Sequence, residues 1–207
     1  MRKEGRVQNF VIALFGIAIV AMSVGFAAYS TTLTIGGGAN GTTANATFKK
    51  AKWHVHYDNS TIQTTGNSTV APGQQTLGVD TDDTNVYFTA TLKKPGDVYE
   101  FTVDVLNEGT YDAELTSVDM STLTAAQDAY INYTITYDGN TFVADQTASK
   151  TVSNQSILEA PSGATPTRET ATVRVEYVQP ANESQLPTSG DVTVNFGASF
   201  VFDEVTE

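Results

Sequence analysis

The chain has 207 residues, a formal net charge of −12 at pH 7 and no cysteine. An acidic surface repels phosphate backbones, which argues against nucleic acid as a partner, and the lack of thiols excludes both disulfides and cysteine chemistry. Stability must therefore come from the hydrophobic core, helped by assembly.

An uncharged apolar run occupies residues 10–28, directly after a short charged segment. Its 19 residues approach the roughly 20 that a helix needs to span a bilayer. The segment ahead of the run is net positive, with the charges of Arg2, Lys3, Glu4 and Arg6. A positive flank holds the N-terminus in the cytoplasm, so we expect an N-terminal apolar helix that directs the rest of the chain across the membrane.

This helix is either a signal peptide or a membrane anchor. Gly25 and Ala27 place small residues where a signal peptidase reads them, which favours cleavage after Ala27. Cleavage would leave about 180 residues, enough for one domain with its own core. We therefore divide the chain into a leader or anchor at 1–27, a strand with a linker at 28–47 and a folded domain at 48–207.

The segment 28–47 joins a short alternating strand to a flexible linker. Side chains on one face of the strand are Tyr29, Thr31, Leu33 and Ile35. The linker at 36–47, GGGANGTTANAT, is rich in small residues and has nothing to bury. This strand is therefore not obliged to pair with its own domain, although an ordinary first strand with a mobile connection fits the pattern equally well.

Alternation of apolar and polar residues dominates the domain at 48–207. Residues 51–57 read as a half-buried strand with Trp53, Val55 and Tyr57 inside, and 58–77 reads as a polar surface excursion. Further inward faces are predicted at alternate positions of the runs 86–92, 99–105, 131–137, 171–177 and 192–202.

Turn signals separate these runs. The turn at 95–97 predicts that 86–92 and 99–105 are neighbouring antiparallel strands, with Glu100 facing outward, and Asp138–Gly139 predicts a hairpin. One helical turn is expected at 121–129, capped by Ser121 or Thr122. Because nearly every element has period two, we predict an all-β fold, an antiparallel β-sandwich of jelly-roll type.

The stretch LKKPGDVYEFTVDVLNEGTYDAEL, at 92–115, resembles TasA/camelysin-type secreted proteins. In that family a Pro-Gly-Asp turn leads into a strand, an Asn-x-Gly turn and the next strand. The resemblance implies a jelly-roll subunit of an extracellular biofilm fibre, in which the N-terminal strand of one subunit completes the sheet of the next. It implies that Tyr29, Thr31, Leu33 and Ile35 are the residues of self-assembly.

Two groups of residues have side chains that could bind a metal ion. His54 and His56 lie two apart on a strand, which can bring both near one metal ion, but they lack the helical His-Glu-x-x-His arrangement, and Lys52 shares their face. We expect both to be solvent-facing, with no catalytic, cofactor or metal site. The acidic loop at 80–85, with Asp80, Asp82, Asp83 and Asn85, departs from the calcium-binding EF-hand spacing and is expected to be solvated.

The sequence thus predicts a non-enzymatic, secreted structural subunit of a surface or biofilm-matrix fibre. Its expected partner is itself, as a homopolymer, together with an anchoring partner at the cell surface. The membrane is involved only through the N-terminal segment. A pilin-like filament that keeps its N-terminal apolar helix is the alternative.

Overall fold

The computed structural model describes residues 30–35, 54–81, 83–188 and 190–205. Within these ranges the chain is all-β, with two sheets and three short 3-10 helices, η1 (Pro72–Gln74), η2 (Gln127–Ala129) and η3 (Glu183–Gln185). No helix of the described part is long and apolar enough to cross a membrane. The N-terminal helix predicted at 1–27 and Trp53 lie outside these ranges.

The larger sheet has eight strands. Its order is β10-β6-β13-β1-β4-β12, with β3 paired to β4 and β9 paired to β6. Every pairing is antiparallel except that of β1 with β4. The strands are β1 (Ser30–Ile35), β3 (Gln75–Val79), β4 (Asn85–Leu92), β6 (Ala113–Met120), β9 (Ser149–Thr151), β10 (Ile157–Leu158), β12 (Val192–Val194) and β13 (Ala198–Glu204).

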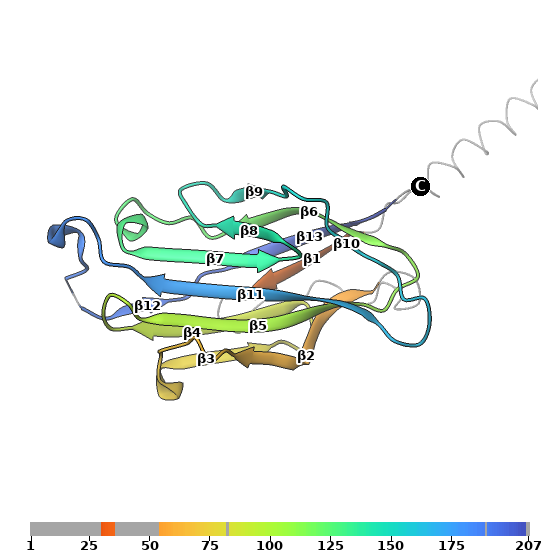
Figure 1. Ribbon diagram of the computed structural model, residues 1–207, viewed down its shortest axis with the longest axis horizontal. Coiled ribbons are helices and arrows are strands. Elements are labelled where there is room, and N and C mark those ends of the chain that lie inside the picture. Colours follow the sequence, from red (N-terminus) through yellow and green to blue (C-terminus); the bar gives the residue numbers. More distant parts are fainter. Residues whose placement is uncertain (1–29, 36–53, 82, 189, 206–207) are drawn as a thin grey trace, which may run out of the picture.

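The smaller sheet has five strands, all antiparallel, in the order β2-β5-β11-β7-β8. They are β2 (Val55–Thr64), β5 (Val98–Asn107), β7 (Ile131–Tyr137), β8 (Asn140–Val143) and β11 (Thr167–Tyr177). The two sheets lie one over the other (Figure 1). The hairpin predicted at Asp138–Gly139 joins β7 to β8, and both residues have the positive φ of its tight turn.

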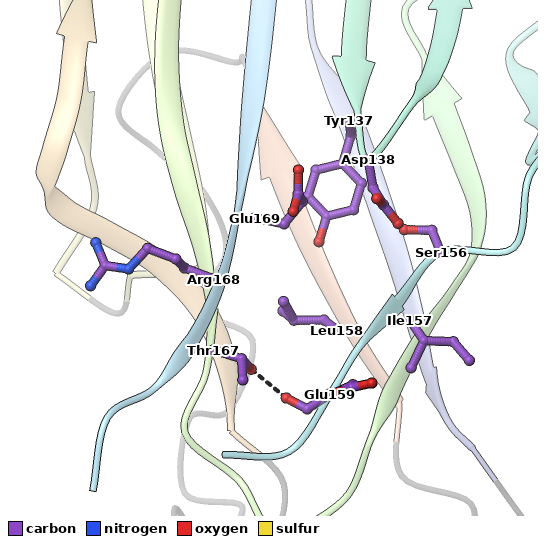
Figure 2. Close-up of a pocket in the computed structure, with 9 residues that line it drawn as sticks. All are labelled: Tyr137, Asp138, Ser156, Ile157, Leu158, Glu159, Thr167, Arg168 and Glu169. Carbon is purple, nitrogen blue, oxygen red and sulfur yellow. Dashed lines mark hydrogen bonds between the residues drawn. The ribbon is translucent and has the colours of Figure 1, made fainter. Parts of the chain in front are cut away.

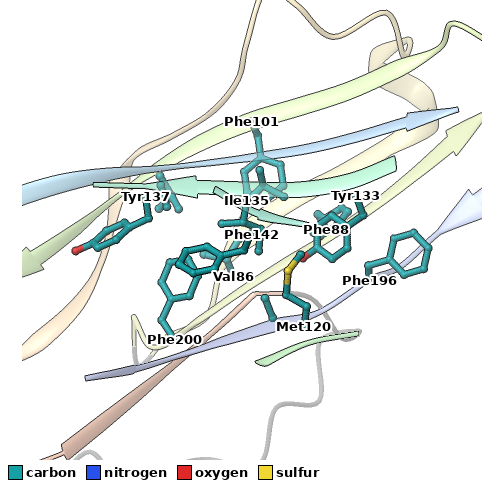
Figure 3. Packing of buried hydrophobic residues seen from close by; sticks show 14 of the residues in the cluster. Val86, Phe88, Phe101, Met120, Tyr133, Ile135, Tyr137, Phe142, Phe196 and Phe200 are labelled. Atoms are coloured by element: carbon teal, nitrogen blue, oxygen red, sulfur yellow. The ribbon is translucent and has the colours of Figure 1, made fainter. Parts of the chain in front are cut away.

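A continuous core fills the space between the two sheets (Figure 3). The alternate apolar residues of the runs 86–92, 99–105, 131–137 and 171–177 are all buried, which confirms these inward faces. Phe88 of the larger sheet packs against Phe101 of the smaller one with ring centroids 5.2 Å apart, and Tyr137 packs against Phe200 at 5.5 Å. These contacts join the sheets into one sandwich-like unit.

The strands β4 and β5 are consecutive but do not pair, contrary to the prediction for 86–92 and 99–105. β4 pairs with β1, β3 and β12, whereas β5 pairs with β2 and β11. The turn between them therefore crosses from one sheet to the other. A hairpin and a crossing require the same alternation, because in both cases the apolar side chains point into the core.

The crossing turn has the backbone geometry that its residues predict. Gly96 has a φ of +93°, and the Asp97 N–H donates to the Lys94 carbonyl over 3.0 Å. The Asp97 carboxylate accepts the N–H groups of Lys93 and Lys94 at 2.8 and 3.2 Å. Pro95 and Gly96 thus occupy the central positions of a type II turn.

Replacing Gly96 with valine should lower the free energy of unfolding by roughly 1–3 kcal/mol, because a β-branched residue is strained at positive φ. The added Cβ would meet no atom within 4 Å, so the cost comes from the backbone alone. Gly66→Val is the matched control, since Gly66 also has open space but no positive φ. Equal urea midpoints for the two variants would contradict the turn assignment.

The polar stretch at 58–77 is partly strand, where a surface excursion is predicted. β2 continues to Thr64, and β3 begins at Gln75. β2 is an edge strand of its sheet, and its pairing with β5 shifts register between Asp58 and Gln63. An edge strand with a bulge is solvated and loses the period of two, so alternation does not detect it.

Glu100 is buried, although it lies on the outward face of β5 as predicted. Its carboxylate accepts hydrogen bonds from Thr65 and Asn67, both at 2.7 Å, and pairs with Arg174 at 3.1 Å. Burial alone would raise the pKa of the Glu100 carboxyl, but these three donors outweigh it and lower the pKa. Glu100 therefore faces outward from the sandwich and is nevertheless buried.

The structure also differs from the predictions for residues 121–129 and 192–202. The helical turn expected at 121–129 is reduced to η2, and Thr124, rather than Ser121 or Thr122, hydrogen-bonds Gln127 in its first turn. Ser121 instead accepts the Gly197 N–H at 2.8 Å. The single run at 192–202 is two strands, because β12 ends before this contact and β13 begins after it.

Candidate functional site

β1 lies in a slot with a strand on each side. It pairs antiparallel with β13 along its whole length, from Ser30 opposite Asp203 to Ile35 opposite Ala198. Its C-terminal end also pairs in parallel with the start of β4, where Ile35 faces Val86. The chain thus fills this slot with its own strand, which is the arrangement of an ordinary first strand.

The slot exists because the final segment of the chain leaves the edge of β4. β12 pairs directly with β4, with Val194 opposite Ala90. Four residues later Ala198 pairs with Ile35, which itself pairs with Val86. β1 therefore separates β13 from β4 by two strand spacings, about 9–10 Å. The chain thus leaves β4 after β12, and β1 fits between β13 and β4.

Leu33 anchors β1 in the core. Its side chain is fully buried, whereas that of Thr32 is exposed, as the alternation predicts. The backbones of the predicted self-assembly residues in β1 pair with β13, as Thr31–Phe202, Leu33–Phe200 and Ile35–Ala198. Tyr29 lies outside the described residues.

A second cluster joins the two histidines to a glutamate. His54 precedes β2, His56 lies within it, and Glu108 follows β5. The Nδ1 atom of His54 and the Nε2 atom of His56 lie 3.1 and 3.6 Å from the same Glu108 carboxylate oxygen. Only 21% and 14% of the two histidine side chains is exposed, so they are half-buried rather than solvent-facing. Lys52 lies outside the described residues.

A buried amide holds the turn that carries Glu108. The Asn107 side chain donates through Nδ2 to the carbonyls of Tyr111 and Leu158, both at 2.9 Å, and to that of Glu159 at 3.4 Å. Its Oδ1 accepts the Gly109 N–H at 2.9 Å. Asn107, which is 1% exposed, therefore ties the end of β5 to the entry of β6 and to β10.

The acidic loop at 80–85 is organised by hydrogen bonds within itself. One carboxylate oxygen of Asp80 accepts the N–H groups of Thr84 at 3.1 Å and Asn85 at 3.3 Å. Asp83 has a φ of +55°, which aspartate tolerates better than most residues. The described part of the loop thus acts as a turn into β4, and Asn85 is buried rather than solvated as predicted. Asp82 of the predicted cluster lies outside the described residues.

An open pocket of about 200 Å³ lies where the β7–β8 hairpin meets β10 and the start of β11 (Figure 2). It is lined by Tyr137, Asp138, Ser156, Ile157, Leu158, Glu159, Thr167, Arg168 and Glu169. The Thr167 hydroxyl donates to the Glu159 carbonyl across one end of it (Figure 2). The lining contains no histidine, so it offers no serine–histidine pair for nucleophilic chemistry.

No family model and no curated protein matches this chain. Among solved structures it is similar to TmCBM61 in complex with β-1,4-galactotriose, with 12% sequence identity and a TM-score of 0.19. The match covers 82% of this chain and 100% of that one. A likeness at this level indicates nothing about the function of this chain.

Proposed function

We propose that this protein is a secreted, non-enzymatic structural subunit of an extracellular fibre at the cell surface or in a biofilm matrix. Its sandwich is of the jelly-roll type, and copies of the chain join when the N-terminal strand of one fills the slot of the next. An anchoring partner at the cell surface connects the fibre to the cell, and the membrane is involved only through the N-terminal segment. The observation that carries the proposal is the position of β1 between β13 and β4.

Exchange of β1 between chains preserves its contacts. A strand from a neighbouring copy makes the same pairs with β13 and β4 and buries Leu33 in the same place. The 18 residues at 36–53 reach up to roughly 60 Å when extended, so their length does not restrict β1 to its own slot. A high concentration of chains, as at a site of secretion, therefore favours the polymer.

Cysteines at Thr32 and Val201 test this proposal. The two residues lie opposite each other in β1 and β13, and opposed antiparallel residues have the Cα separation that a disulfide accepts. The chain has no cysteine of its own, so each disulfide reports one pairing of these strands. We expect oxidised filaments of the double variant to give a ladder of covalent multimers on denaturing, non-reducing gels.

The single variant Thr32→Cys is the control, because it can give dimers but no ladder. Filaments of the double variant that release only internally cross-linked monomers would contradict exchange through β1. A chain that stays monomeric at every concentration would contradict the fibre itself.

A further inference from the structure

We propose that His54, His56 and Glu108 bind a divalent transition-metal cation of the zinc, copper or nickel class. Their three ligand atoms all lie within 4.8 Å of one another. A tetrahedral ion with bonds of about 2.0–2.1 Å holds its ligand atoms about 3.4 Å apart. The distances of 3.1 and 3.6 Å from the two histidines to the glutamate oxygen bracket that value. Imidazole together with one carboxylate suits these ions better than calcium or magnesium.

The ring of His56 is already held as a metal ligand requires. Its Nδ1 lies 3.0 Å from the Tyr57 carbonyl oxygen. Because a carbonyl can only accept, Nδ1 must carry the proton, and in the neutral ring Nε2 presents its lone pair. A backbone carbonyl that accepts from the second ring nitrogen is the usual partner of a metal-bound histidine.

The other ring nitrogen of His56 lacks a hydrogen-bond partner in the described part of the chain, and a bound cation would supply the missing interaction. Its Nε2 is buried and has no hydrogen-bond partner among the described residues. In the neutral ring the Nε2 lone pair lies 3.6 Å from the Glu108 carboxylate, and a lone pair and a carboxylate repel each other. A cation between them turns this repulsion into two bonds.

His54 would complete the set of ligands after a rotation of its ring. Its ring stacks on that of His56, with centroids 4.3 Å apart and planes 16° apart. An ion in the plane of the fixed His56 ring requires His54 to rotate about its side-chain torsions, while its Nδ1 stays near Glu108. The backbone there is firmly placed, because the Glu108 N–H donates to the His54 carbonyl over 2.9 Å.

The ion would fasten two neighbouring chain segments. His54 and His56 belong to the start of β2, and Glu108 to the turn after β5, so one cation bridges the adjacent ends of two paired strands. Its effect is on the stability of the fold, because a cation that binds only the native chain stabilises it by mass action. This inference does not depend on fibre assembly.

Thermal unfolding of the full chain with zinc chloride or with EDTA tests the site. The protein must be purified without a histidine tag, because His54 and His56 are the only histidines of the chain. We expect zinc at about 100-fold above its Kd to raise the melting temperature by roughly 5–10 °C, with one ion bound per chain by calorimetric titration. Magnesium at the same concentration should have no effect.

Three variants complete the test. Glu108→Gln and His56→Gln should each weaken zinc binding by at least about tenfold, and His56→Gln should lose the visible absorption that cobalt gains from nitrogen ligands. Glu183→Gln is the control, because this exposed glutamate lies in η3, away from the cluster. A wild-type chain with no zinc-dependent shift, or a shift that both ligand variants retain, would overturn the proposal.

Discussion

Replacing Leu33 with aspartate should abolish filament formation and destabilise the single chain by more than about 4 kcal/mol. Removal of a fully buried leucine costs about 2–5 kcal/mol, and burial of an unpaired carboxylate adds to that cost. The altered β1 should therefore leave the slot rather than remain in it with its charge buried. Electron microscopy of the secreted protein and urea denaturation measure the two effects.

Thr32→Asp is the matched control for this experiment, because it introduces the same charge one residue away on the exposed face of β1. It should change the free energy of unfolding by no more than about 0.5 kcal/mol and leave assembly intact. A peptide of residues 28–38 should refill the slot of Leu33→Asp and restore its stability without restoring polymers, since the peptide has no slot of its own. Normal filaments from Leu33→Asp would contradict the assembly proposal.

Replacing Asn107 with aspartate should cost about 3–5 kcal/mol of stability. The substitution removes a buried donor that serves three carbonyls and puts a negative charge against them. The end of β5, the entry of β6 and β10 would all lose their common partner. Urea denaturation monitored by circular dichroism measures the loss.

Asn182→Asp provides the control for the same chemical change. Asn182 is exposed and is the N-cap residue of η3, a position where aspartate serves as well as asparagine. Its midpoint should match that of the wild type. If the Asn107→Asp midpoint also matched, the buried amide would have no role in holding the strands together.

The inward faces were predictable because alternation reports burial and little else. Tyr99, Phe101 and Leu92 are buried as their positions in the pattern require. The same pattern could not assign β4 and β5 to different sheets, because apolar faces that meet across a core look identical to those of a hairpin. The sheet that a strand joins depends on which backbones pair, and no local pattern in the sequence indicates that pairing.

In the candidate sites, too, the burial of side chains was predictable but the pairing of strands was not. The alternation at Thr32 and Leu33 predicts one exposed and one buried side chain, and both positions agree. The slot depends on a departure of the chain after Val194, for which the Asn195–Phe196–Gly197 sequence is only a weak signal. Glu108 was missed as a partner of His54 and His56, because a long-range strand pairing brings them together and no spacing in the sequence records it.

The pairing of β1 with β13 also determines when the fold can close during synthesis. Ser30 pairs with Asp203, which lies 173 residues further along the chain. At about 5–20 residues per second, the last strand follows the first by roughly 10–35 s. Throughout that interval a new subunit has a strand to give but no finished slot to receive one. A completed subunit at the end of a filament can capture this strand first, so growth by this route would have a fixed polarity.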